Sequence, residues 1–149
     1  MHIKQQIHTH YIDVINSKIL MLQQTLADLK ESGSNEPKST AGDKHETALA
    51  MLQIEQANTR AQLHEALEQR LALVNINPGI ITAKILPGSY VKTNKGNFYI
   101  SVALGKLVID GETVMAISPQ SPLGAKLMGS CVNESVTINA HTYLVESIE

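Results

Sequence analysis

The sequence predicts an α+β protein in which an N-terminal antiparallel helical hairpin, or coiled coil, precedes a mostly antiparallel sheet domain with one short helix. The apolar residues of the first half recur at helical spacing, whereas those of the second half alternate with a period of two between turn signals. A chain of 149 residues with 3% aromatic residues has room for one ordinary domain or two small ones. We expect the hairpin over residues 1–75, a linker over 76–84 and the sheet domain over 85–149.

The first predicted helix carries a heptad pattern. Its apolar residues are spaced alternately three and four apart, at Ile12, Ile15, Ile19, Leu22, Leu26 and Leu29. This spacing keeps one apolar seam turned toward a partner helix. The polar stretch 31–42, which holds two glycines and a proline, ends the helix and predicts a tip loop.

The second predicted helix covers residues 43–74, which are rich in the good helix formers Ala, Leu, Gln and Glu. Ala50, Ala57 and Ala61 interleave with leucines, and we expect such small residues to face the first helix and let the two approach closely. Helices of ~30 residues reach about 45 Å. The short connection favours an antiparallel hairpin, with a homodimeric bundle as the alternative.

After the stretch NINPG at 75–79, apolar residues alternate with polar ones at a period of two, which is typical of strands. Turns are expected at Pro87-Gly88, Asn94-Lys95-Gly96, Gly105-Lys106, Asp110-Gly111 and Asn139-Ala140. The predicted strands are Ser89–Thr93, Phe98–Ala103, Leu107–Ile109, Thr113–Ile117, Ser135–Ile138 and His141–Ser147.

One short helix is predicted within ISPQSPLGAKLMG, residues 117–129. The Ser121 hydroxyl suits an N-cap, because it can accept a hydrogen bond from an otherwise unpaired backbone N–H. Pro122 suits the first helical position, where no N–H is needed. Leu123 and Leu127 share one face, and Gly129 supplies the left-handed residue after the last turn.

Charge and cysteine content exclude several classes of protein. Residues 1–75 carry 7 Lys and Arg against 9 Asp and Glu, and residues 76–149 carry 5 against 5. Neither half has the basic excess of a protein that holds DNA by its phosphates, so independent DNA binding is not expected. A single Cys131 forms no internal disulfide. Without an apolar run near ~20 residues or a secretory signal, we expect a cytoplasmic protein and no membrane association.

Six histidines invite a metal-site hypothesis. His8 and His10 are two apart, which places them on different faces of a helix, and no Cys pair accompanies them. We therefore expect solvated surface histidines.

The pattern I-S-x-x-S-P-x-x-x-x-L-x-G, followed by a closing pair of strands, resembles the C-terminal domain of the bacterial Gre transcript-cleavage factors (GreA and GreB). The matching residues are Ile117, Ser118, Ser121, Pro122, Leu127 and Gly129. The resemblance implies an FKBP-like C-terminal domain behind a coiled coil. It also implies a transcription elongation factor that binds RNA polymerase, inserts its hairpin into the secondary channel and stimulates cleavage of backtracked transcripts. Such a factor assists hydrolysis by the polymerase and is not itself an enzyme.

The start of the second helix is similar to the coiled-coil tip of this family, G-D-x-x-E-N-A-E-Y, with matches at Gly42, Asp43, Glu46 and Ala48. The resemblance implies that Asp43 and Glu46 help to hold a catalytic Mg²⁺ shared with the polymerase, with no cofactor bound by the factor alone. Nascent RNA would then be a partner only within the complex. The alternative is helix capping, because an acid followed three residues later by Glu is also a capping-box pattern.

The family's polymerase-docking loop maps to Gln120, Ser121 and Pro122, and for Ser121 simple helix capping is again the alternative. Leu49 and Ala50 stand where the family has an acidic residue and a tyrosine. This difference supports an alternative function, a regulator that binds the secondary channel without stimulating cleavage. A further alternative is a helical-hairpin adaptor for another protein.

Overall fold

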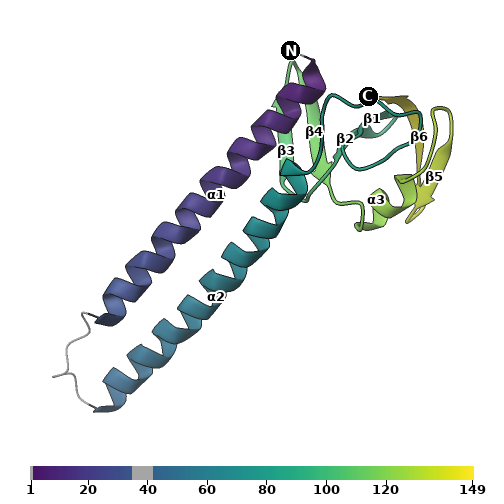
Figure 1. Cartoon of the computed structure of the whole chain (residues 1–149). Coiled ribbons are helices and arrows are strands. Elements are labelled where there is room, and N and C mark those ends of the chain that lie inside the picture. The colour runs from purple at the N-terminus through teal and green to yellow at the C-terminus, as the bar shows by residue number, and fades with distance from the viewer. Residues whose placement is uncertain (1, 35–41) are drawn as a thin grey trace. The chain divides into compact units, whose positions relative to one another are not determined.

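The computed structural model describes residues 2–34 and 42–149. The helices are α1 (Ile3–Ser34), α2 (Gly42–Val74) and α3 (Pro122–Leu127). The strands are β1 (Tyr90–Thr93), β2 (Gly96–Ile100), β3 (Gly105–Ile109), β4 (Glu112–Ile117), β5 (Ser135–Ile138) and β6 (His141–Ile148) (Figure 1). The predicted α+β class is confirmed.

The chain forms two compact units. Unit 1 contains Met1–Val14 together with Leu71–Glu149, and unit 2 contains Ile15–Arg70. Both long helices therefore contribute residues to both units. Among the described residues, no helix combines the length and the apolar character that a membrane span requires.

Unit 2 is an antiparallel pair of helices. The Gln56 side-chain amide donates a hydrogen bond to the Leu29 carbonyl at 3.3 Å, and Arg70 donates to the Asn16 side chain at 3.3 Å. The later residue of α2 thus meets the earlier residue of α1, as in an antiparallel pair. The predicted hairpin is therefore confirmed within unit 2. Its seam buries residues of both helices, namely Ile15, Ile19, Leu22, Thr59 and Ala66.

The small residues that let the helices approach are not those that we predicted. Ala50, Ala57 and Ala61 are exposed, whereas Thr59 and Ala66, one heptad apart, are buried. Composition alone did not fix the rotation of α2 about its axis, because the leucines of this helix form no single seam. α1 also continues through Ser34 into the range where we expected the tip loop, and residues 35–41 of that loop lie outside the described residues.

The six strands form one sheet in the order β3-β4-β2-β1-β6-β5, in which β2 and β4 are parallel and all other neighbours are antiparallel. The predicted boundaries fail around β2, which ends at Ile100, and at Gly105-Lys106, which opens β3 instead of forming a turn. The order of the strands explains both differences. Residues 101–104 must cross the position of β4 before β3 can begin, a lateral distance of about 10 Å.

Strand alternation gives the sheet two different faces. On the face that we call the α1 face, the register aligns Tyr90 with Tyr99 and Tyr99 with Ala116, and all three are buried. On the opposite face, which we call the α3 face, lies the apolar core of Ile85, Val91, Ile100, Leu127 and Val145. α3 contributes Leu127 to this core and thereby fixes its own position in unit 1.

The first turns of α1 cover the α1 face through aromatic and polar contacts. The Tyr11 ring stacks on Tyr99 with 6.3 Å between centroids and 12° between planes, and its hydroxyl donates to the Gly105 carbonyl at 2.8 Å. His8 Nδ1 and the Tyr99 hydroxyl share a hydrogen bond of 2.7 Å. Lys4 donates to the Ile80 carbonyl at 2.6 Å. The expectation of a solvated His8 is therefore wrong, because the buried Tyr99 hydroxyl needs a polar partner.

We expect Ala140→Gly to raise the free energy of unfolding by about 1 kcal/mol, because Asn139 and Ala140 connect β5 and β6 with φ values of 49° and 66°. A left-handed backbone is unfavourable for alanine and free of strain for glycine. Urea unfolding measures the change. Ala125→Gly, at an exposed helical position of α3, is the matched control and is expected to lose about 0.5–1 kcal/mol. A destabilised Ala140→Gly protein would contradict the strained turn.

His8 predicts a pH dependence of stability. Burial, and secondarily the Lys4 ammonium, lower the pKa of His8 below its ordinary value of 6.5. As the pH falls below 6.5, the unfolded chain therefore binds more protons than the folded chain. The contribution of neutral His8 to the free energy of unfolding is thus fully present above that pH and is lost on acidification. We expect His8→Gln, measured by urea unfolding between about pH 7.5 and 5, to have a weaker dependence on pH than the wild type. Equal pH dependence in the two proteins would exclude His8 as the cause.

Candidate functional site

The loop before α3 is ordered by the predicted cap. Ser121 has an extended backbone, with φ of −65° and ψ of 158°, and its hydroxyl accepts from the Gly124 N–H at 3.1 Å. The same hydroxyl donates to the Ser118 carbonyl at 2.7 Å. Pro122 occupies the first helical position, and Gly129 has the left-handed φ of 82°. The predicted start and end of this helix are confirmed.

Gly124 is a residue whose importance the sequence pattern did not reveal. A Cβ atom at this position would lie 2.0 Å from the Ser118 carbonyl oxygen, which is backbone and cannot turn aside. Glycine is thus required for the close packing of α3 against the preceding loop. A signal was present in the sequence, because a glycine within so short a helix needs a structural reason.

The same loop exposes two of the predicted docking residues. Gln120 and Pro122 are exposed, while Ser121 is half-buried. The Gln120 backbone N–H donates to the Ser118 hydroxyl at 3.1 Å, and that hydroxyl donates to the Gln120 side-chain oxygen at 2.6 Å. Gln120 and Pro122 therefore belong to a loop whose conformation is held by hydrogen bonds to Ser118.

The predicted tip acids lie at the start of α2. The helix begins at Gly42, so Asp43 belongs to its first turn, and the side chain of Asp43 lies outside the described residues. Glu46 is exposed. Residues three apart lie on the same side of a helix, and its N-terminus favours negative charge. The acids belong to unit 2 and the Gln120 loop to unit 1.

Among the described residues, no group of three or more His, Cys, Asp or Glu side chains could hold a metal ion. His8 is committed to Tyr99, and the His10 ring packs edge-on against Tyr11 at 5.5 Å between centroids.

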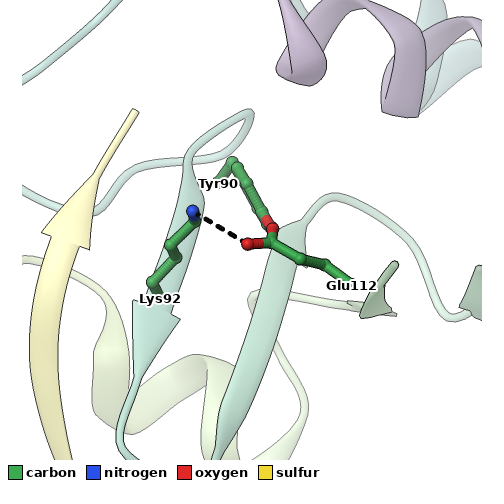
Figure 2. Close-up of polar contacts among 3 residues, drawn as sticks. All are labelled: Tyr90, Lys92 and Glu112. Carbon is green, nitrogen blue, oxygen red and sulfur yellow. Dashed lines mark hydrogen bonds and ion pairs between the residues drawn. The ribbon is translucent and has the colours of Figure 1, made fainter. Parts of the chain in front are cut away.

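Figure 2 shows a polar cluster that the sequence did not single out. The Tyr90 hydroxyl donates to one carboxylate oxygen of Glu112 at 3.0 Å, and the Lys92 ammonium lies 3.3 Å from the other. These hydrogen bonds, from Tyr90 first and Lys92 second, lower the pKa of Glu112. Burial raises the pKa of Tyr90, as does its bond to Glu112. Glu112 therefore stays ionised and neutralises Lys92. The cluster thereby links β1 to β4 through side-chain contacts.

The comparisons with known proteins give one structural similarity. A solved structure, "Structure of the transcription factor Gfh1", is similar to this chain over 96% of its length and over 91% of that chain, with 16% sequence identity and a TM-score of 0.33. No family model matches the sequence, and no curated protein matches it.

We expect Ser121→Ala to lower the free energy of unfolding by about 1 kcal/mol, because it removes both the N-cap and the bond to Ser118. Ser121→Thr keeps a hydroxyl that can make both bonds, and it should restore most of the loss. Thermal unfolding of the two variants tests this expectation. Equal losses in both would show that the hydroxyl is not what orders the loop.

Proposed function

We propose that this protein is a Gre-like transcription factor that binds RNA polymerase, inserts its hairpin into the secondary channel and stimulates cleavage of backtracked transcripts. The observation that carries the proposal is the placement of Asp43 and Glu46 in the first turns of a 33-residue helix that belongs to an antiparallel hairpin. The resemblance of 117–129 to the Gre C-terminal domain gives independent support.

The chemistry requires carboxylates that can be delivered to a distant active centre. A helix of 33 residues spans about 50 Å, and two packed helices make a narrow rod. Glu46 is exposed, so its carboxylate is accessible to a metal ion. Mg²⁺ prefers carboxylate oxygens and retains several waters, so two acids can complete a site whose other ligands belong to the polymerase. A second metal ion in such a centre activates the attacking water and stabilises the leaving oxygen.

Docking is assigned to the ordered loop before α3. Gln120 and Pro122 are exposed on a base that Ser118 and Ser121 fix by hydrogen bonds. A rigid pair of this kind suits recognition of a protein surface and is separate from the acids. Binding and cleavage should therefore be separable by mutation.

The second candidate is a regulator that occupies the channel without stimulating cleavage. Leu49 is half-buried and Ala50 is exposed, and neither offers the carboxylate or hydroxyl that the Gre tip has at these positions. If the family chemistry needs those groups, the hairpin would block the channel without activating water.

We expect the double variant Asp43→Asn/Glu46→Gln to slow factor-stimulated transcript cleavage on a backtracked elongation complex by about tenfold or more, the scale of losses when groups that support a metal site are removed. Asn and Gln keep the capping capacity of the helix start while removing both charges. The assay therefore separates a catalytic role from helix capping.

Glu65→Gln/Glu68→Gln is the matched control, since these acids have the same i, i+3 spacing on the exposed surface of α2. It should leave both cleavage and polymerase binding unchanged. If neither wild type nor variants accelerate cleavage although all bind polymerase, the regulator is the correct function. Absence of polymerase binding would support the adaptor and overturn the proposal.

A further inference from the structure

The α3 face of the sheet contains a cleft that neither the tip acids nor the Gln120 loop uses. Its cavity volume is about 270 Å³, and its lining includes Lys95, Asn97, Phe98, Lys106, Thr113 and Met115. Lys95 lies between β1 and β2, and the other lining residues belong to β2, β3 and β4.

Strand register explains how the cleft forms. Met115 lies opposite Phe98 on β2 and opposite Lys106 on β3, so the three side chains make one cross-strand row. Phe98 packs at the margin of the α3-face core. Its ring meets Tyr143 edge to face, with 6.0 Å between centroids and 73° between planes. The cleft therefore has an aromatic wall held in orientation by a second ring.

The two sheet faces also differ in charge. Alternation along β4 places Thr113 in the cleft and Glu112 on the α1 face, where the carboxylate neutralises Lys92 at 3.3 Å. The cleft lining thus holds two lysines and no acid. Lys95 lies 5.7 Å from the Tyr143 ring centroid and 3.4 Å from His141 Nδ1, and no ion pair to Lys95 or Lys106 is present among the described residues.

We propose that this cleft binds single-stranded nucleic acid, with phosphates at Lys95 and Lys106 and a base against Phe98 and Met115. The combination of cationic side chains with an aromatic surface is what single strands use, because every base offers an apolar face and every linkage a negative charge. An acidic peptide would satisfy the lysines but would leave Phe98 and Met115 without a flat apolar partner. A duplex is not expected, since its bases are already stacked.

Two phosphate contacts imply weak binding, which agrees with a chain of net charge −2. The inference does not depend on polymerase, so it is tested with the full-length protein alone. The probe is a fluorescein-labelled oligouridine of about eight nucleotides. Fluorescence anisotropy is followed from about 25 to 200 mM salt, because phosphate contacts are recognised by their salt dependence.

We expect Lys95→Gln/Lys106→Gln to weaken binding at low salt by about tenfold or more. The plot of log K against log salt should become less steep by about 1.4, because each lost phosphate contact on a single strand removes about 0.7. Lys84→Gln/Lys126→Gln removes the same charge from exposed positions outside the cleft lining, and it should keep the wild-type slope.

Three results would overturn the proposal. One is the absence of wild-type binding at the lowest salt. Another is an equal loss of binding in the cleft variant and the control variant. The third is displacement of the oligouridine by an oligoglutamate of equal charge at equal concentration, which would show that the site reads charge alone. Thermal unfolding of each variant establishes that it is folded before its binding is compared.

Discussion

The burial of Tyr11 against Tyr99 is the constraint on which the rest of unit 1 depends. The chain has four tyrosines, one phenylalanine and no tryptophan, so few large rings are available to close a core. A buried phenolic hydroxyl also needs a partner, and the partners here are His8 for Tyr99 and the Gly105 carbonyl for Tyr11. Removal of the first turns of α1, which carry His8 and Tyr11, would leave the Tyr99 ring uncovered and its hydroxyl without its hydrogen-bond partner.

As a result, α1 packs against the sheet in unit 1 and against α2 in unit 2. Ile7 and Tyr11 are buried in unit 1, and Ile15, Ile19 and Leu22 are buried in unit 2. The buried positions follow one another at steps of four, and the last step is three. A single apolar line therefore serves a sheet at one end and a partner helix at the other.

The two faces of the sheet carry different side chains, and this difference underlies the proposed nucleic-acid cleft. On the α1 face, Glu112 is occupied by Tyr90 and Lys92. On the α3 face, Phe98 and Met115 lie between two lysines, and α3 anchors the loop that exposes Gln120. Faces of different character thus arise from one sheet, because neighbouring residues of each strand point in opposite directions. The tip acids stand apart from both, on α2.

Features that depend on local spacing were predictable from the sequence by itself. These features are the Ser121 cap, the left-handed Gly129, the Asn139-Ala140 turn and the part of the predicted α1 seam that is buried, at Ile15, Ile19 and Leu22. The seam departs from the predicted heptad toward the start of α1, where Tyr11 is buried and Ile12 is half-buried. The candidate loop and the start of the acid-bearing helix were predictable for the same reason. The partnership of residues far apart in the chain was decided by tertiary structure alone. His8 is buried because Tyr99 lies 91 residues away, and Glu112 meets Tyr90 because parallel pairing of β2 and β4 brings their strands into one sheet. Local sequence patterns determine the conformation of the backbone in each element. Strand order and the rotation of a helix about its axis depend instead on which surfaces, distant in sequence, can be buried together.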